Sequence, residues 1–267
     1  MDIVLVGLAA VIFYLLSSFL QYQHLAHAQA NNAITKLLAS FAVILHGITT
    51  YQLMQTNQGV DVGLLPMVTL IGCVSAALTL LISFKKSVDN WYLLLFPTAV
   101  LSLLAALFIP PSVQWREQLS GGLIAHILLS VFAYSLLMIS ACQALLLACQ
   151  DYHLRHKQNS FMLNTLPPVQ TMETLLFALL NASFVLLTLS IFTGILFLKN
   201  LFAQHVAHKT IFSIVSWGLL AALLWGRHAR GWRGHTAIRL TLSAFVLLLL
   251  AYVGSSVVLQ FILHRTI

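Results

Sequence analysis

The sequence predicts an all-α membrane protein, a polytopic bundle of about eight transmembrane helices with both chain ends on the outer side. Of its 267 residues, 60% are hydrophobic and 7% are charged, whereas a soluble domain carries about 25% charged residues. Apolar runs of about 20 residues, the length that crosses a bilayer, recur along the whole chain. The acidic residues all lie outside these runs: Asp2, Asp61, Asp89, Glu117, Asp151 and Glu173.

Each apolar run predicts one span. In chain order they are Ile3–Leu20, Ile34–Met54, Leu64–Phe84, Trp91–Ile109, Gly122–Ala148, Thr174–Leu198, Thr210–Trp225 and Ala237–Leu263. No basic segment precedes the first run, so we interpret it as a retained helix and not as a signal peptide. We expect one integral-membrane domain over residues 1–267, with four spans in residues 1–110 and four in residues 122–267.

Lysine and arginine predict the orientation, because they collect in the cytoplasmic loops of membrane proteins. Nine of the 13 lie in the first, third, fifth and seventh loops, and four lie on the opposite side. The protein is therefore expected to span a bacterial inner membrane with both termini outside. The longest loop, Asp151–Glu173, is then cytoplasmic. The fifth span, extended to Gln150, exceeds 20 residues and must tilt or project into the cytoplasm.

Several function classes lack support in the sequence. The absence of carboxylates from the apolar runs argues against an ion pump, since pumps keep acidic residues in the membrane. Walker A motifs, Ser/His/Asp arrangements and carboxylate pairs are missing, so we expect no catalytic residues, and a non-enzymatic role is favoured. The cysteines form no Cys-x-x-Cys pair. We interpret the net charge of +7 as a topology signal and not as a nucleic-acid-binding surface.

The 11 histidines are the remaining candidates for chemistry. His46 lies near the middle of the second run, where an imidazole needs a partner and must face the bundle. It is either a hydrogen-bonded core histidine or a ligand. Six others lie in the basic loops and are interpreted as solvated or headgroup-facing: His24, His27, His153, His156, His228 and His235.

Four histidines are expected together at the outer face, namely His126, His205, His208 and His264. Neutral imidazole binds haem iron as well as zinc or copper. Because no thiolate or carboxylate accompanies these residues, a bis-histidine haem site is more natural than a closed zinc site, and we expect no other metal.

A family resemblance follows from several strings in the C-terminal half. Arg230-Gly231-Trp232-Arg233-Gly234 follows one span, and Ala251-Tyr252-Val253-Gly254 lies in the next. Further matches run from His126 to Tyr134, from Pro167-Pro168 to Glu173, and over Thr193-Gly194. The sequence resembles the cytochrome c assembly membrane proteins, the CcsA/HemX-like family, and its first four spans are similar to the HemX-like branch.

The resemblance implies that the protein carries or handles haem near its outer face. By position, the family's two exterior histidine ligands fall on His126 and His264, with His208 and His46 as further candidates. The segment from Lys199 to His208 departs from the family, because it lacks the Trp-rich core that presents haem for attachment. The resemblance therefore implies the shortened, HemX-like branch without the full haem-attachment platform.

The expected partners are the lipid bilayer, haem, and membrane or periplasmic assembly proteins, with no nucleic acid. Two alternatives remain open. One is a membrane carrier or carrier accessory subunit that uses the bundle interior and His46. The other is a regulatory scaffold in tetrapyrrole metabolism whose loop Asp151–Glu173 meets a partner.

Overall fold

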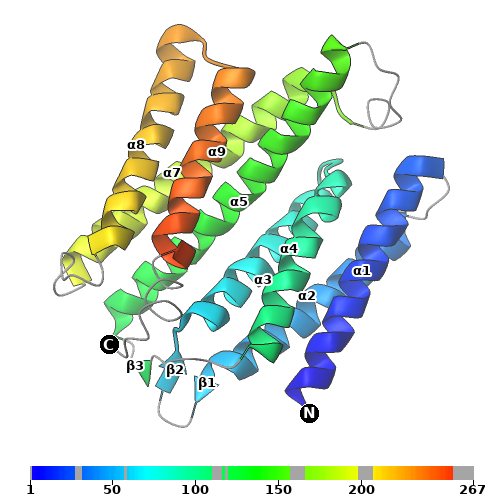
Figure 1. Cartoon of the computed structure of the whole chain (residues 1–267), viewed down its shortest axis with the longest axis vertical. Coiled ribbons are helices and arrows are strands. Elements are labelled where there is room, and N and C mark those ends of the chain that lie inside the picture. The colour runs from blue at the N-terminus through cyan, green and yellow to red at the C-terminus, as the bar shows by residue number, and fades with distance from the viewer. Residues whose placement is uncertain are drawn as a thin grey trace. The chain divides into compact units, whose positions relative to one another are not determined.

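A computed structural model gives the fold of the chain, and it describes residues 2–27, 32–56, 59–109, 116–117, 120–156, 166–197 and 207–254. Among these residues, eight helices are long and apolar enough to cross a membrane, which confirms the predicted number of spans. The chain divides into two compact units (Figure 1). Unit 1 comprises Met1–Glu117 and Gln150–Pro168, and unit 2 comprises Gln118–Cys149 and Val169–Ile267.

Unit 1 is built on four helices, each packed against two others. They are α1 (Ile3–His27), α2 (Asn32–Met54), α3 (Leu64–Ser83) and α4 (Tyr92–Phe108), with a 3-10 turn, η1 (Asp89–Trp91), before α4. The closed ring of contacts runs from α1 to α2, α3, α4 and back to α1. Alanines at the helix contacts, including Ala10, Ala39 and Ala42, are fully buried. Small residues let membrane helices approach closely, which explains this packing.

Aromatic side chains fill the middle of unit 1. Tyr14 packs against Phe96 with ring centroids 4.9 Å apart, and Phe96 stacks on Tyr92 at 4.4 Å. All three are fully buried. A small antiparallel sheet that the sequence did not predict lies at one end of the unit, formed by β1 (Gln55–Thr56), β2 (Gly59–Asp61) and β3 (Arg116–Glu117).

Unit 2 contains the other four spans. They are α5 (Gly121–Arg155, of which residues 121–149 belong to this unit), α7 (Val169–Phe197), α8 (Ala207–Arg230) and α9 (His235–Leu249). The predicted extension of the fifth span is confirmed, because α5 is 35 residues long. A π-helical turn, η2 (Leu250–Gly254), follows α9 and packs on α8. The predicted eighth span is helical to Gly254, and residues 255–263 lie outside the described part.

Successive helices of unit 2 run in opposite directions, which fixes what lies at each end (Figure 1). The starts of α5 and α8 share one end with the finish of α7 and with η2. The opposite end carries the finish of α8 and the start of α9, joined by the turn at residues 231–234. The first end bears His126 and the first turn of α8 with His208, and the second bears Arg227, Arg230, Arg233 and Arg239.

Candidate functional site

His126 lies in the second turn of α5 and is held by α7. Its Nδ1 is 2.9 Å from the main-chain oxygen of Ser190. A carbonyl oxygen can only accept, so Nδ1 carries the proton in the neutral ring. Nε2 is then left with its lone pair, and no described residue forms a hydrogen bond with it. This is the tautomer in which histidine binds a metal, with the other nitrogen fixed by a carbonyl.

Two serines lock the helices together beside this imidazole. Ser130, one turn after His126, donates to the main-chain oxygen of His126 at 2.7 Å. The hydroxyls of Ser130 and Ser190 are 2.7 Å apart. Since the Ser130 proton is already used, Ser190 is the donor in that contact. The chain of hydrogen bonds fixes α5 against α7 at the depth of His126.

Gly194 lets the imidazole lie directly on the backbone of α7. A Cβ atom at this position would be 3.1 Å from Cε1 of His126 and 3.3 Å from Nδ1. Thr193 adds a hydroxyl 3.5 Å from Nδ1. The Thr193-Gly194 string therefore corresponds to the surface on which the His126 ring rests.

The other predicted ligands of this end are not brought to His126 by the described residues. His208 belongs to the first turn of α8, at the same end of unit 2, but its side chain lies outside the described part. His205 and His264 lie wholly outside it. The pairing of His126 with His264 or His208 therefore stays a prediction.

Two tyrosines and a lysine also lie at this end of unit 2. Tyr252, in the π turn η2, meets Tyr134 of α5 edge to face with ring centroids 6.2 Å apart. The ammonium group of Lys209, in α8, lies 5.2 Å from the centre of the Tyr252 ring. No carboxylate lies within ion-pair distance of Lys209 in the described residues. The string at residues 251–254 thus forms a π turn, a feature often found at functional sites, and presents Tyr252 to a half-buried cation.

His46 occupies a different setting in unit 1. It is fully buried, which confirms the prediction that it faces the bundle and not lipid. Its Nδ1 is 3.1 Å from the hydroxyl of Tyr14. Among the described residues, this nitrogen is the only hydrogen-bond partner of that hydroxyl. The backbone of Thr69 lies nearby. No described atom meets hydrogen-bonding geometry with Nε2, however.

The Tyr14 contact determines the tautomer of His46. The buried phenol proton needs an acceptor, and Nδ1 is the one available among the described residues, so Nδ1 accepts and Nε2 carries the proton. In this arrangement His46 offers a hydrogen-bond donor and no lone pair. Of the two candidate ligands whose side chains are described, His46 and His126, only His126 keeps an Nε2 lone pair that could coordinate a metal.

Sequence reasoning missed the partners of both histidines. Ser130 could have been found, because residues four apart share a helix face. The Ser190 carbonyl and the Tyr14 hydroxyl could not, since 64 and 32 residues separate them from their histidines. In the described part, no group of three or more His, Cys, Asp or Glu side chains could hold a metal ion. Among the described residues, His126 therefore has no second histidine, cysteine or carboxylate side chain grouped with it as part of a metal-binding cluster.

Comparison with known proteins identifies the family. The family described as "Cytochrome C assembly protein" matches residues 4–263. The chain belongs to the cytochrome c assembly protein family. It is 32% identical over 228 residues to "Inner membrane protein YpjD" of Escherichia coli strain K12, a match that covers 84% of this chain and 86% of the relative. A second relative is the "Uncharacterized 28.8 kDa protein in nifR3-like 5'region" of Azospirillum brasilense, 35% identical over 131 residues and 48% of each chain.

No solved structure gives a significant match. Membership confirms the predicted resemblance and supports haem handling by a multi-span membrane protein at the level of the family.

Proposed function

We propose that this protein binds and handles haem at the end of unit 2 that carries His126, with His126 as one axial ligand of the iron. The observation that carries the proposal is the hydrogen bond from Nδ1 to the Ser190 carbonyl, which leaves Nε2 as the coordinating nitrogen. The iron would supply the coordination chemistry. The protein would fix the imidazole between α5 and α7.

Lys209 supports the same assignment. Haem carries two propionate groups, and a cation at its edge stabilises them through charge-assisted hydrogen bonds. Lys209 is the cation of the described residues at this end of unit 2, and it has no carboxylate partner there. We expect Lys209→Gln to weaken haem binding about fivefold, the equivalent of about 1 kcal/mol.

The second axial ligand is proposed to be His264, or His208 in its place. His208 belongs to the first turn of α8, which begins at the His126 end of unit 2, and His264 follows η2 in the sequence. Because terminal residues are often poorly ordered unless they are tied down, His126 is the more decisive position to test.

The test is the visible spectrum of the purified full-length protein with added haem. We expect a Soret band in the wild type, its loss or strong displacement in His126→Ala, and a weaker five-coordinate spectrum in His264→Ala. His228→Ala is the matched control, since His228 is exposed at the opposite end of α8 and should keep the wild-type spectrum. An unchanged spectrum in His126→Ala would exclude the proposed ligand.

The same experiment separates the rival assignment, a carrier that uses the interior of unit 1. That rival is favoured by the buried Nε2 of His46, which has no hydrogen-bond partner among the described residues. The carrier assignment replaces ours if two results are found together. The protein takes up no haem, and a growth or transport defect of cells that lack it is rescued by the wild type but not by His46→Leu.

We also propose that both termini face outward from the inner membrane, which puts His126 on the outer side. The support is the division of cations, nine on one side and four on the other. A periplasmic reporter fused after Ile267 should be active, and one inserted near Asn159 should be inactive. Reversed signals would move the His126 site to the cytoplasmic side.

A further inference from the structure

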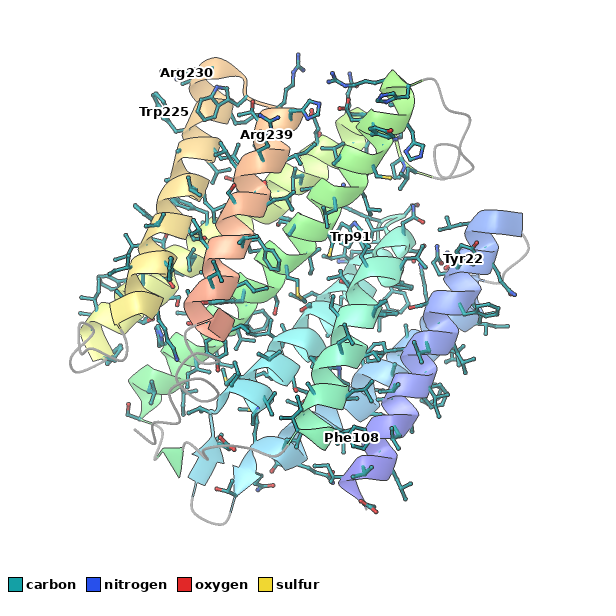
Figure 2. The ribbon with its side chains drawn as sticks, viewed as in Figure 1. Tyr22, Trp91, Phe108, Trp225, Arg230 and Arg239 are labelled. Atoms are coloured by element: carbon teal, nitrogen blue, oxygen red, sulfur yellow. The ribbon has the colours of Figure 1, made fainter. Side chains whose placement is uncertain are left out.

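The end of unit 2 opposite His126 carries a cluster of arginine and tryptophan side chains that the haem site does not use. Figure 2 shows Trp225 and Arg230 at the finish of α8, with Arg239 close by on α9. We call this surface the arginine–tryptophan end, and it consists of Trp225, Arg227, Arg230, Trp232, Arg233 and Arg239.

These arginines have no acidic partner in the described part of the chain. Unit 2 contains a single acidic residue, Glu173, and its carboxylate accepts a hydrogen bond from the Gly234 main-chain N–H at 2.8 Å. Within the described ranges, neither Arg227, Arg230, Arg233 nor Arg239 forms an ion pair. Four guanidinium groups thus gather at one end of two spans without neutralisation.

Arg230 is close to two indole rings. Its guanidinium carbon is 5.3 Å from the centre of the Trp225 ring and 5.8 Å from that of Trp232. Cation–π contacts of this kind use the face of the guanidinium and leave its N–H edge available. No hydrogen bond or ion pair to the Arg230 side chain is formed by the described residues, so its N–H groups are available to a ligand.

The turn between α8 and α9 is shaped to place Trp232 there. Gly231, directly after α8, adopts a φ of +66°, which an L side chain rarely does. The Trp232 main-chain N–H then donates to the carbonyl of Gly226 at 3.2 Å. The indole folds back onto Gly226, where a Cβ atom would collide with the ring. Arg227 completes the turn, with a nitrogen 3.5 Å from the Trp232 carbonyl.

We propose that the arginine–tryptophan end is a binding site for the phosphate group of an anionic glycerophospholipid. The surface lies where two helices long and apolar enough to cross a membrane end, which is where headgroups are expected, and Trp225 is 60% exposed there. Tryptophan favours this interface, and a guanidinium binds phosphate through two parallel hydrogen bonds. The inference holds for whichever leaflet the surface faces, provided that the leaflet contains anionic lipid.

A lipid fits this surface better than a soluble phosphate compound. A soluble ligand would use the arginines but leave the exposed indole of Trp225 without an apolar partner. A lipid provides both, with its phosphate at Arg230 and its glycerol and upper acyl chains against Trp225. Each basic residue near an anionic membrane surface adds to the electrostatic attraction between the protein and the lipid headgroups.

The experiment uses the full-length protein in a neutral detergent, titrated with phosphatidylglycerol or with phosphatidylcholine, and follows lipid binding by native mass spectrometry. We expect preferential retention of phosphatidylglycerol, reduced about fivefold in Arg230→Gln and also reduced in Arg239→Gln. The matched control is Arg155→Gln, because Arg155 is equally exposed but pairs with Asp151 at 2.9 Å. The control should retain the wild-type preference.

Other outcomes would overturn the proposal. Equal retention of both lipids by the wild type would do so, and so would equal losses in Arg230→Gln and Arg155→Gln. Glycerol phosphate without acyl chains is the remaining arm: if it competes as well as the lipid, the ligand is a soluble phosphate compound. Melting curves without added lipid should coincide for the wild type and the variants, since all the substituted side chains are exposed, so a loss of binding is not a loss of fold.

Discussion

His46 and His126 use the same nitrogen for a hydrogen bond but meet opposite partners. In unit 1 the partner of Nδ1 is a hydroxyl that must donate, and in unit 2 it is a carbonyl that must accept. The two rings are consequently opposite tautomers. Only His126 keeps a lone pair at Nε2. Neither the burial of a histidine nor the number of histidines therefore indicates a ligand. The informative feature is whether the hydrogen-bond partner of Nδ1 donates or accepts, because that decides whether Nε2 keeps its lone pair.

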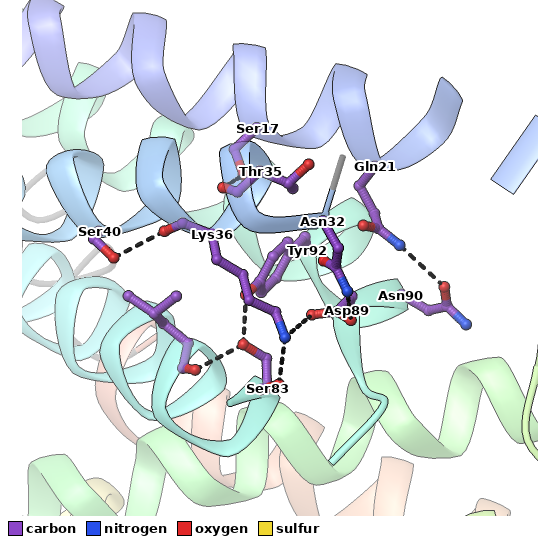
Figure 3. Close-up of polar contacts among 11 residues, drawn as sticks. Ser17, Gln21, Asn32, Thr35, Lys36, Ser40, Ser83, Asp89, Asn90 and Tyr92 are labelled. Carbon is purple, nitrogen blue, oxygen red and sulfur yellow. Dashed lines mark hydrogen bonds and ion pairs between the residues drawn. The ribbon is translucent and has the colours of Figure 1, made fainter. Parts of the chain in front are cut away.

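The charged groups of the two units differ in the same way. Figure 3 shows that the basic side chain of Lys36 in unit 1 has both a charged and a polar partner. Lys36 pairs with Asp89 at 3.5 Å and donates to the Ser83 carbonyl at 2.7 Å. Asn32 donates to the second carboxylate oxygen of Asp89 at 3.2 Å, and the hydroxyls of Ser83 and Tyr92 are 2.6 Å apart. The described arginines of unit 2 form no ion pair with a described carboxylate. We infer that polar groups stabilise unit 1 and bind ligands in unit 2.

Breaking the Lys36–Asp89 pair is expected to have the largest effect. In the Lys36→Met variant, the carboxylate of Asp89 loses its cation. The Asp89 side chain is only 13% exposed, and Asn32 is its remaining described partner. Removing one member of a buried pair costs about 3 kcal/mol of unfolding free energy. Chemical unfolding in detergent measures this cost. The double variant Lys36→Met/Asp89→Leu should recover more than half of it, and an unchanged midpoint for Lys36→Met would contradict the stabilising role of unit 1's charges.

Tyr14→Phe tests the His46 half of the comparison. The substitution removes the proton donor from the fully buried Nδ1 and should cost about 1.5 kcal/mol of unfolding free energy. Tyr22→Phe on the same helix is the matched control, because Tyr22 is 52% exposed and has no described hydrogen bond. Haem uptake should be the same in both variants. Loss of the Soret band in Tyr14→Phe would move the candidate ligand to unit 1.

The helices and their number followed from the sequence, because membrane spans are set by length and apolarity alone. Their ends followed less well. The first span was predicted to stop at Leu20, where the continuous apolar run ends, whereas α1 continues through Gln21 and His24 to His27. Gln21 reaches Asn90 at 3.5 Å, a contact between residues 69 apart that no local pattern indicates.

His126 could be named as a candidate from the sequence, whereas the hydrogen bond that fixes its tautomer could not be predicted. The position of His126 followed from the resemblance, but its tautomer depends on a main-chain oxygen of another helix, which has no signature in residue type. The arginine–tryptophan end shows the converse case. Its residues formed part of the resemblance, yet their sequence-based interpretation was as orientation signals, because the lack of acidic partners becomes visible only when the described contacts are known.

Gly194→Ala should separate ligation from stability in unit 2. The added methyl group would press on the imidazole at 3.1 Å and displace it from the Ser190 carbonyl. Haem affinity should fall about fivefold, or about 1 kcal/mol, while unfolding free energy changes less. Gly218→Ala is the control, since no atom lies within 4 Å of its added Cβ and alanine favours a helix. Equal affinities in the two variants would show that the His126 ring does not depend on this packing.

The smallest effect is expected for Glu173→Gln, which tests why unit 2 keeps its single acidic residue. Glutamine retains a carbonyl that can accept from the Gly234 N–H, so unfolding free energy should change by less than about 0.5 kcal/mol. Glu173→Leu removes the acceptor and should cost about 1 kcal/mol. If Glu173 instead acts through its charge on the arginines, both variants will lose the same stability. Because Glu173→Gln also removes the single acidic side chain of unit 2, retention of phosphatidylglycerol should rise slightly, and a decrease would show that the carboxylate orders the lipid site itself.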